Sequence, residues 1–419
     1  MRNSIALPDK HFPRAGEVRW LNAWARGLLY RQMGQLQEGE IVLTDGESRR
    51  FGQRTADFPL SAHLIIDDQA FYADVVFGGS LGAAEAYMAG FWRCTDLVAL
   101  VRILVRNRHV VEGMDGGLSL LAAPLRKRIH AFNRNTRKGS RSNIEAHYDL
   151  GNDFFRLFLD ESLMYSCAYF ERPELSLHQA SLAKLDLICR KLKLGPRDHV
   201  LEIGTGWGGF ALHAASRYGC RVTTTTISRQ QFELARERVQ EAGLTDRITV
   251  LYEDYRDLAG TYDKLVSIEM IEAVGHQYYD AYFGKCAALL RPDGLALIQA
   301  ITIADQHFRR ARDEVDFIKR YIFPGSCIPS VTALLESATR ASDLKLIGLE
   351  DIGPHYAFTL RRWREAFLAN LEAVRRQGYS EAFIRMWEFY LAYCEGGFAE
   401  RALGDVQMLL AKPFYRGNE

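Results

Sequence analysis

The sequence lacks the features of membrane-spanning, disulfide-linked and zinc-binding chains. No apolar run in its 419 residues approaches the 18 residues that a spanning helix requires, and the longest candidate runs are short and contain Arg102 or Gln299. Its seven cysteines are scattered, odd in number and without a CxxC pair. The first residues show neither the apolar core nor the small-residue cleavage site of a signal peptide. We therefore expect a cytoplasmic chain with reduced thiols and no metal site.

The chain also lacks a net charge of either sign. It has 53 Lys and Arg against 52 Asp and Glu, a formal charge of +1, so no global field would attract nucleic acid. One local exception is the stretch 118–142, which contains no acidic residue at all. Seven basic residues lie between Arg126 and Arg141 in this stretch. No nucleic-acid partner is expected, and any charged partner would have to meet such a local patch.

The length and the composition predict a globular protein of two domains. Apolar residues make up 48% and charged residues 25% of the chain, which is enough to build a sizeable core. Residues 1–112 mix apolar segments with turn signals and predict a small α+β domain, and residues 113–142 predict a basic linker. Over residues 143–419 the pattern changes to an alternation of short β-branched runs with helix-length segments.

This alternation predicts an open α/β domain with a mostly parallel sheet, because strands that alternate with helices form βαβ units. The expected strands are 199–203, 221–227, 248–253, 264–270 and 295–303, followed by 344–349 and 406–410. Helix-length segments such as 230–241 and 277–290 lie between them. The segment 304–341 is too long for a tight connection and predicts an insertion over the carboxyl edge of the sheet.

The strongest local motif is VLEIGTGWGGF at residues 200–210, in which a strand runs into glycines and then into a helix. Glycines allow a tight turn and a close approach of a ligand, and the following helix presents free N–H groups. A dinucleotide loop has GxGxxG and an acidic residue about 20 positions later, whereas here Glu202 lies inside the strand and Gly204, Gly206 and Gly208 follow it. This spacing resembles the S-adenosylmethionine (SAM) loop of Rossmann-like methyltransferases. A nucleotide site and mere packing are the alternatives.

The second strand ends in TISRQQ at residues 226–231, without the acidic residue that usually binds the ribose. Thr226 and Gln231 are candidates for neutral hydrogen bonds to the cofactor instead. Ser228 is also a candidate N-cap for the helix that follows, and the two interpretations can hold together.

Five further segments resemble the cyclopropane-fatty-acyl-phospholipid synthases, in the branch similar to the plant-type enzymes. They are IEAHYDLGNDFF at 144–155, LMYSCAYF at 163–170, VSIEMIEAVGH at 266–276, FIKRYIFPG at 317–325 and HYAFTL at 355–360. The resemblance covers residues 143–419, and residues 1–112 share a looser likeness to the N-terminal domain of the family. It implies a Rossmann-like class I SAM methyltransferase fold with a seven-stranded, mostly parallel sheet.

The same resemblance implies a SAM-dependent transfer of a methylene group to the cis double bond of an acyl chain in a membrane phospholipid. The alkene attacks the sulfonium methyl group, a carbocation forms on the chain, and a base removes a proton from the new methyl group so that the ring closes. In the family this base is a bound bicarbonate ion. The positions that would hold it here are Cys167, Glu272, Gln299, Ile301 and Tyr356.

Two residues depart from the usual family pattern. Gln299 replaces a His, as it does in the plant-type relatives, and Ala273 replaces the His that commonly follows the Glu. A neutral amide donates a hydrogen bond but carries no positive charge, so the anion would bind less tightly. The same departures keep open a methyl transfer without ring closure, which would give a methyl-branched unsaturated chain.

The resemblance also implies which residues surround SAM. The expected cofactor residues are Tyr165, Ser166, Glu202, Gly204, Gly206, Gly208, Thr226, Gln231, Tyr255 and Arg256. Aromatic side chains, among them Tyr165 and Tyr356, would line a dry pocket whose ring faces stabilise a carbocation. Cys394 matches a position traditionally marked as catalytic, although the chemistry needs no nucleophilic thiol.

Taken singly, the same residues have simpler interpretations. Cys167 alone is typical of a buried small apolar side chain, and Glu272 of an ion pair with an Arg. Tyr356 is typical of a turn cap after Pro354, so only the joint pattern favours a site. A non-catalytic lipid- or SAM-binding protein is the alternative from another class. A nucleic-acid methyltransferase is disfavoured because no base-flipping motif of the Asn-Pro-Pro-Tyr kind is present.

A phospholipid substrate and the lack of a spanning segment together predict peripheral contact with the membrane. The basic stretch Arg126–Arg141 would dock on anionic headgroups, where each cation contributes about 1 kcal/mol, or would simply form a solvated linker. The family likeness of residues 1–112 implies a homodimer.

Overall fold

The computed structural model describes residues 19–116 and 150–417. The greater part of the predicted linker, with the basic stretch Arg126–Arg141, lies outside these residues. The described chain divides into two compact units. The first comprises residues 19–116, Glu314–Tyr321 and Trp363–Ala402, and the second comprises 150–313, Ile322–Arg362 and 403–417.

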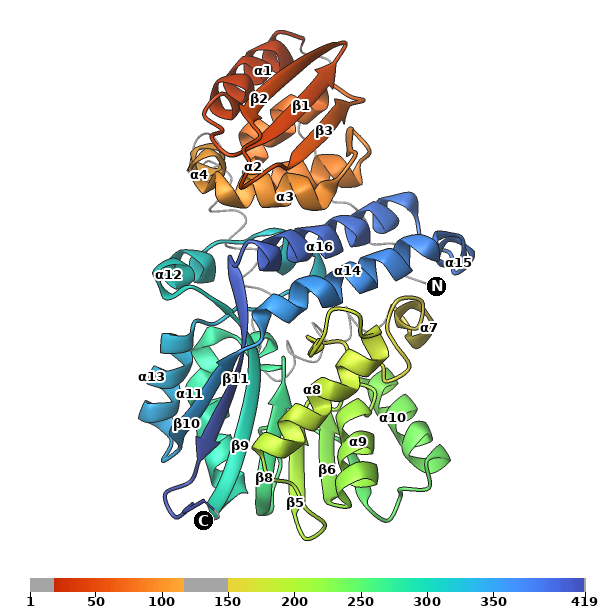
Figure 1. Cartoon of the computed structure of the whole chain (residues 1–419), viewed down its shortest axis with the longest axis vertical. Coiled ribbons are helices and arrows are strands. Elements are labelled where there is room, and N and C mark those ends of the chain that lie inside the picture. The colour runs from red at the N-terminus through yellow and green to blue at the C-terminus, as the bar shows by residue number, and fades with distance from the viewer. Residues whose placement is uncertain (1–18, 117–149, 418–419) are drawn as a thin grey trace. The chain divides into compact units, whose positions relative to one another are not determined.

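The first unit combines a four-stranded sheet with helices, which confirms the α+β prediction (Figure 1). Its N-terminal elements are α1 (Arg19–Met33), β1 (Gly39–Asp45), β2 (Glu47–Gln53), β3 (Ser61–Ile66), α2 (Ala70–Met88), β4 (Trp92–Cys94), α3 (Leu97–Arg106) and α4 (Arg108–Gly116). The strands are ordered β2-β1-β3-β4, with β1 and β3 parallel and the other pairs antiparallel. Ile41 and Leu43 of β1 are fully buried, so one face of this sheet supplies the core.

Two C-terminal helices, α15 (Leu371–Arg376) and α16 (Glu381–Ala399), belong to the same unit. Arg385 of α16 donates to the backbone carbonyls of Tyr87 and Trp92 at 2.6 and 2.7 Å. The predicted boundaries assign these helices to the domain 143–419. Contacts between segments far apart in the sequence group them with the N-terminal elements instead.

The second unit contains a seven-stranded sheet, and all seven predicted strands are present. They are β5 (His199–Ile203), β6 (Arg221–Thr226), β7 (Ile248–Tyr252), β8 (Tyr262–Ile268), β9 (Leu290–Ile303), β10 (Lys345–Asp351) and β11 (Leu403–Ala411). Their order is β10-β11-β9-β8-β5-β6-β7, and within this described sheet only β11 runs antiparallel to its neighbours. This arrangement confirms the predicted α/β Rossmann-like fold.

Helices cover both faces of this sheet (Figure 1). The helices of the second unit are α7 (Asn152–Phe155), α8 (Leu177–Lys191), α9 (Gly209–Tyr218), α10 (Arg229–Glu241), α11 (Tyr279–Leu289), α12 (Asp305–Asp313), α13 (Val331–Ala341) and the first part of α14 (Gly353–Ala369). Successive strand residues point to opposite faces, so Val200 packs in a cluster with α8 and α9, whereas Leu201 packs in one with α11 and α13. Burial on both faces explains why a central strand such as β9 is a nearly continuous apolar run from Leu295 to Ile303.

The predicted insertion 304–341 contains α12, a π-helix (Ile318–Ile322) and α13. Its backbone reaches the carboxyl ends of two strands. The Ile303 N–H donates to the Pro329 carbonyl at 2.9 Å, and the Cys327 N–H donates to the Glu272 carbonyl at 2.8 Å. The last part of the insertion, α13, is a regular covering helix whose apolar side chains join the core of the sheet.

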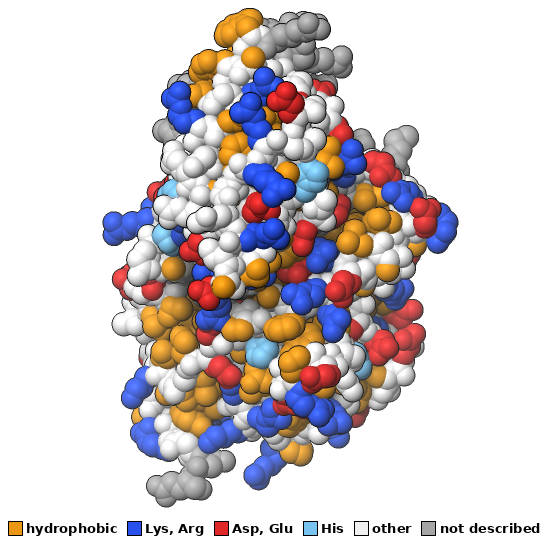
Figure 2. Space-filling model, turned by 45° about the horizontal axis from the view of Figure 1, so that its top comes forward, with side chains coloured by type: hydrophobic (Ala, Val, Ile, Leu, Met, Phe, Trp, Pro, Cys, Tyr) orange, Lys and Arg blue, Asp and Glu red, His pale blue; other side chains and the backbone are white. Residues whose placement is uncertain are grey.

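No helix in the two described ranges combines the length and the apolarity needed to cross a bilayer. On the face that Figure 2 shows, acidic and basic side chains are interspersed. That face therefore carries no broad field of one sign, in keeping with the balanced charge of the sequence.

Candidate active site

The carboxyl ends of the parallel strands place most of the predicted site residues along one edge of the sheet in the second unit. Glu202 of β5 pairs with residues of both β6 and β8, and Ile268 of β8 pairs with Gln299 of β9. The glycine loop, the end of β6 and the segment after β8 therefore lie side by side. Open α/β sheets bind their ligands at this edge.

The loop after β5 requires glycine on conformational and steric grounds. Gly204, Gly206 and Gly208 have φ angles of +103°, +52° and +85°, in the left-handed region that other residues rarely adopt. At Gly209, the first residue of α9, a Cβ atom would lie 2.5 Å from the sulfur of Met164. The loop is therefore tight, and a second segment approaches it closely.

That second segment, which precedes α8, is held against the glycine loop. Arg238 of α10 donates from Nη1 to the carbonyl oxygens of Ser162 at 3.2 Å and Trp207 at 2.6 Å. The ring of Tyr165 packs on Phe155 at 5.4 Å between centroids, and Phe155 packs on Trp207 at 4.9 Å. Two segments that were predicted to surround SAM are thus brought together.

Glu202 is a buried carboxylate with an unmet hydrogen-bonding requirement. It is only 2% exposed, and its Oε2 has no hydrogen-bond partner among the described residues. Burial raises the pKa of Glu202 to about 8, against smaller lowering effects of Thr224 and Lys184. An unpartnered buried polar group costs roughly 1–3 kcal/mol. Glu202 therefore fits a ligand that brings hydroxyl donors to it.

At the end of β6, Thr226 and Gln231 bind each other. The Thr226 hydroxyl donates to Oε1 of Gln231 at 2.8 Å, and both side chains are buried. The hydroxyl of Ser228 accepts from the Gln231 backbone N–H, which confirms the predicted cap of α10. The backbone N–H groups of Gly204 and the next residue donate to the carbonyl of the residue before Thr226, so this pair lies next to the glycine loop.

Arg256, after β7, is fixed by Asp254. The guanidinium donates to both carboxylate oxygens of Asp254, at 2.8 and 2.6 Å. It lies 5.6 Å from the centre of the Tyr255 ring, which packs edge-on against Tyr282. Tyr255 and Arg256 follow a strand of the same parallel set and thus share its carboxyl edge.

Glu269, directly after β8, accepts hydrogen bonds from three residues that were predicted to hold an anion. The Cys167 backbone N–H donates to Oε1 at 2.7 Å, and Nε2 of Gln299 donates to the same oxygen at 2.8 Å. The Tyr356 hydroxyl donates to Oε2 at 2.6 Å. A side-chain carboxylate therefore occupies the place where these three predicted residues converge.

Gln299 links Glu269 to a second carboxyl group. It is fully buried on β9, and its Nε2 also donates to Oδ2 of Asp405 on β11 at 2.9 Å. Its Oε1 accepts from Nε2 of Gln407 at 3.0 Å. Burial, and then the charge of Glu269, raises the pKa of Asp405 well above its usual value. The charge of Glu269 thus disfavours ionisation of Asp405.

Glu272 lies in a 3₁₀ turn (Ile271–Ala273) and binds the backbone of Ile301. Its Oε1 accepts from the Ile301 N–H at 2.5 Å, while its Oε2 is buried without a partner among the described residues. Burial, and then the charge of Glu269, raises the pKa of Glu272 to about 8. Of the five residues predicted for the anion site, Cys167, Gln299 and Tyr356 therefore bind Glu269, whereas Glu272 and Ile301 bind each other.

A buried cation, Lys184 of α8, belongs to the same region. Its Nζ donates to the hydroxyl of Ser166 at 2.8 Å. Burial lowers the pKa of Lys184, while the charges of Glu269 and other acidic neighbours raise it. Ser166, a predicted cofactor residue, is thus tied to Lys184.

The two predicted cysteines lie in different units. Cys167 is fully buried, and its thiol donates to the carbonyl oxygens of Ala168 at 3.3 Å and Ile352 at 3.7 Å. Burial raises the pKa of this thiol well above its usual value. Cys394 lies on α16 of the first unit, where burial raises the pKa of its thiol as well. Cys394 is thus not among the residues that the sheet edge brings together.

Three charged residues of this cluster were not predicted, namely Glu269, Asp405 and Lys184. Glu269 has a sequence signal, because it ends the apolar run of a strand just before Glu272. Lys184 also has one, because it lies in the buried stripe of α8, four residues before Ile188. Asp405 has none, since its place depends on the pairing of β11 with a strand far away in the sequence.

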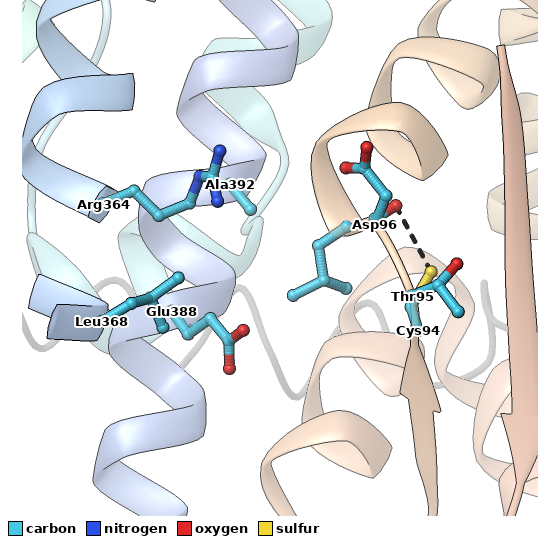
Figure 3. A pocket seen from close by; sticks show the side chains of 8 residues that line it. Cys94, Thr95, Asp96, Arg364, Leu368, Glu388 and Ala392 are labelled. Carbon is cyan, nitrogen blue, oxygen red and sulfur yellow. Dashed lines mark hydrogen bonds between the residues drawn. The ribbon is translucent and has the colours of Figure 1, made fainter. Parts of the chain in front are cut away.

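A pocket of about 290 Å³ in the first unit lies between the turn after β4 and the residues of α14 and α16 (Figure 3). It is lined by Cys94, Thr95, Asp96, Leu97, Arg364, Leu368, Glu388 and Ala392. Asp96 caps α3, and Arg364 pairs with Glu395 at 2.7 Å. Glu388 accepts from the Tyr87 hydroxyl at 2.9 Å. The charged side chains that line this pocket therefore already have partners within the protein, and nothing about them points to a ligand.

Comparisons with known proteins match most of the chain. The family model described as mycolic acid cyclopropane synthetase matches residues 135–408, which include every predicted site residue. Tuberculostearic acid methyltransferase UfaA1 of Mycobacterium tuberculosis is 38% identical over 80% of this chain and 79% of its own length. Cyclopropane-fatty-acyl-phospholipid synthase of Escherichia coli is 36% identical over 83% of this chain and 86% of its own length. The crystal structure of mycolic acid cyclopropane synthase CmaA1 complexed with SAH and CTAB has a TM-score of 0.61 at 32% identity, over 65% of this chain and 98% of that one.

Proposed function

The chain belongs to the mycolic acid cyclopropane synthetase family of SAM-dependent enzymes, and on that premise we propose the reaction that it performs. It transfers a methylene group from SAM to the cis double bond of an acyl chain in a membrane phospholipid and so forms a cyclopropane ring. The observation that carries this proposal is the carboxyl cluster at the same sheet edge as the glycine loop. The relative from Escherichia coli is named for this product.

The residues around the glycine loop fit SAM. When bound, SAM supplies a sulfonium methyl group that an alkene can attack. The unpartnered Oε2 of Glu202 suits the two hydroxyl groups of a ribose as donors. The left-handed glycines let a ligand approach the backbone without a steric penalty. CmaA1 is complexed with SAH, the form of SAM that has lost the methyl group.

The electrons of the reaction come from the acyl chain. Its π electrons form a bond to the methyl carbon as the carbon–sulfur bond breaks, and a positive charge appears on the acyl chain. A base then takes a proton from the new methyl group, and the electrons of that C–H bond close the ring. The protein must exclude water, position the double bond and accept the proton.

The described side chains suit a passing positive charge. Ring faces such as those of Tyr165 and Tyr356 each stabilise a desolvated cation by roughly 0.5–2 kcal/mol. Burial of Cys167 and Glu272 keeps this part of the site dry, which strengthens such electrostatic effects.

Bicarbonate, which the family resemblance implies, does not fit the groups expected to hold it. The donors of Cys167, Gln299 and Tyr356 are bound to Glu269. The N–H of Ile301 is bound to a second side chain of this protein. No step of the proposed reaction is therefore assigned to bicarbonate.

A second candidate is methyl transfer without ring closure, and one comparison favours it. The relative UfaA1, at 38% identity, is named a tuberculostearic acid methyltransferase. The two reactions share the carbocation and differ in the proton that the base removes. Ring closure takes that proton from the transferred methyl group, whereas an unsaturated chain with an intact methyl branch forms when the proton is taken from the acyl chain itself.

Isotope labelling tests the proposal. Cells that express the chain are fed methyl-deuterated methionine, and their lipid fatty acids are analysed by mass spectrometry. A cyclopropane product retains two deuterium atoms on a chain without the double bond. Three retained deuterium atoms on an unsaturated chain would favour the second candidate, and no labelled acyl chain would reject both.

We also propose that the protein is cytoplasmic and contacts the bilayer peripherally, because a phospholipid substrate must be reached without a spanning helix in the described chain. The basic stretch Arg126–Arg141 is the proposed contact. Binding to anionic liposomes should weaken with salt and with neutral substitutions at Arg126, Lys127 and Arg128. Unchanged binding by that variant would reject the contact. A homodimer through residues 1–112 stays a prediction.

A further inference from the structure

We infer that the side-chain carboxylate of Glu269 is the base that takes the proton from the methylated acyl chain. The inference rests on the proposed function and names the group that performs its deprotonation step. It differs from the family expectation because the base is part of the protein and no bound anion is needed.

Three hydrogen-bond donors converge on the side-chain carboxylate of Glu269. Two donors bind Oε1, from the Cys167 backbone and the Gln299 amide, and the Tyr356 hydroxyl binds Oε2. A carboxylate and bicarbonate present the same planar pair of oxygens. The Glu269 side chain therefore satisfies the donor set that an anion would otherwise need to satisfy.

Glu269 is also more exposed than the two carboxyl groups next to it. Asp405 is fully buried and Glu272 is 9% exposed, so neither carboxyl group opens to a substrate. Glu269 is partly exposed although it binds three buried donors. Of these three carboxyl groups, Glu269 is therefore the one that an acyl chain can reach directly.

The backbone of Glu269 has an unusual conformation. Its φ angle is +48°, in the left-handed region that favours glycine and disfavours a residue with a Cβ atom. The conformation is held by the bond from its N–H to the Gln299 carbonyl at 2.9 Å and by the three bonds to its side chain. Strain of this kind is kept where the position of a side chain matters.

Three other ionisable groups face Glu269. Asp405 on β11 and Glu272 after β8 both have raised pKa values, through burial first and then through the charge of Glu269. Burial lowers the pKa of Lys184 of α8, and the charge of Glu269 raises it. A carboxyl group must be ionised to accept a proton, and the raised pKa values disfavour the ionised forms of Asp405 and Glu272.

The step balances without a co-reactant. The C–H bond of the transferred methyl group breaks, its electron pair forms the third bond of the ring, and the proton binds a carboxylate oxygen of Glu269. The partly exposed carboxyl group then releases the proton to solvent before the next turnover.

The test starts with the native protein, so it does not depend on the folding of a variant. Turnover of cis-unsaturated phospholipid vesicles with SAM is measured in buffer freed of carbon dioxide, with and without added bicarbonate. The expected rate is the same in both. A rate that falls without bicarbonate and returns on its addition would overturn the inference.

Two variants of Glu269 then separate chemistry from structure. E269Q keeps the shape of the side chain without its basicity, and turnover should fall roughly 10²–10⁴-fold. E269G removes the carboxylate and leaves its three hydrogen-bond donors available to a small anion. Added formate or bicarbonate should therefore restore part of the rate of this variant. ¹³C-bicarbonate should bind E269G but not the native protein when followed by NMR. SAH affinity should stay within about twofold in both variants.

Glu237→Gln, an exposed acidic position on α10, is the matched control and should keep the native rate. An E269Q protein that is folded and retains more than a tenth of the native rate would overturn the inference. So would bicarbonate binding to the native protein. A native protein that labels no acyl chain would instead remove the proposed function, and the inference with it.

Discussion

Replacement of Glu202 by Gln is expected to stabilise the ligand-free protein and to weaken SAM binding. Burial raises the pKa of Glu202 from 4.5 to about 8, a shift that corresponds to ~5 kcal/mol between the two protonation states. A raised pKa favours the protonated carboxyl group. Its contribution to stability is therefore complete below pH 4.5 and is lost as the pH rises through 8.

The effect of E202Q on stability should therefore depend on pH. Gln keeps the shape of the side chain but cannot ionise, so its free energy of unfolding should match that of the native protein near pH 4.5. At pH 9 the variant should gain ~1–3 kcal/mol, less than the full shift because buried sites relax. Urea unfolding at the two pH values measures this, with Glu237→Gln as the exposed control.

The effect of E202Q on binding should have the opposite sign. A carboxylate accepts hydrogen bonds from two ribose hydroxyls, whereas an amide offers one acceptor, so the Kd of SAH should rise roughly 10- to 100-fold. Calorimetry at pH 7 in buffers of different ionisation enthalpy should show proton release when the native protein binds SAH, and a smaller release with the variant. Lower stability at pH 9 together with unchanged SAH affinity would refute the reasoning.

Three further predictions concern other parts of the site. Tyr356→Phe removes the hydroxyl that donates to Glu269, so kcat should fall about 10- to 100-fold while the affinity for SAH is kept. An unchanged kcat in steady-state kinetics would contradict this. Gly206→Ala places a Cβ atom on a residue with a φ of +52°, so the free energy of unfolding in urea should fall by ~1–2 kcal/mol and SAH should bind more weakly. An unaltered unfolding midpoint would contradict the prediction that this loop requires glycine. Cys167→Ala and Cys394→Ala should keep kcat within about threefold, because burial raises the pKa of both thiols and Cys167 contacts Glu269 through its backbone N–H. A tenfold loss in either variant would implicate the sulfur.

The fold of the second unit could largely be predicted because its signals are local. Strands such as β5 and β6 are buried on both faces and appear in the sequence as runs of apolar or β-branched residues, and glycines with left-handed φ angles mark the turn after β5. Ser228 predicts the start of α10, because its side chain caps this helix by accepting a hydrogen bond from the backbone N–H three residues later. Each of these features is decided by neighbours in the sequence.

The features that were not predicted depend on partners far away in the sequence. Helix α16 joins the N-terminal unit through Arg385, whose acceptors lie about 300 residues earlier. Asp405 reaches Gln299 only because β11 pairs antiparallel with β9. The motif that carries Glu272 also contains Glu269, but no sequence pattern shows that Glu269 has a left-handed backbone and accepts three hydrogen bonds.

The most direct measurement combines the purified protein, vesicles of cis-unsaturated phospholipid and methyl-deuterated SAM in buffer freed of carbon dioxide. The account predicts an acyl product that retains two deuterium atoms, lacks the double bond and forms at the same rate when bicarbonate is added. A product that forms only with bicarbonate would contradict the role of Glu269, and the absence of any labelled acyl chain would contradict the proposed reaction itself.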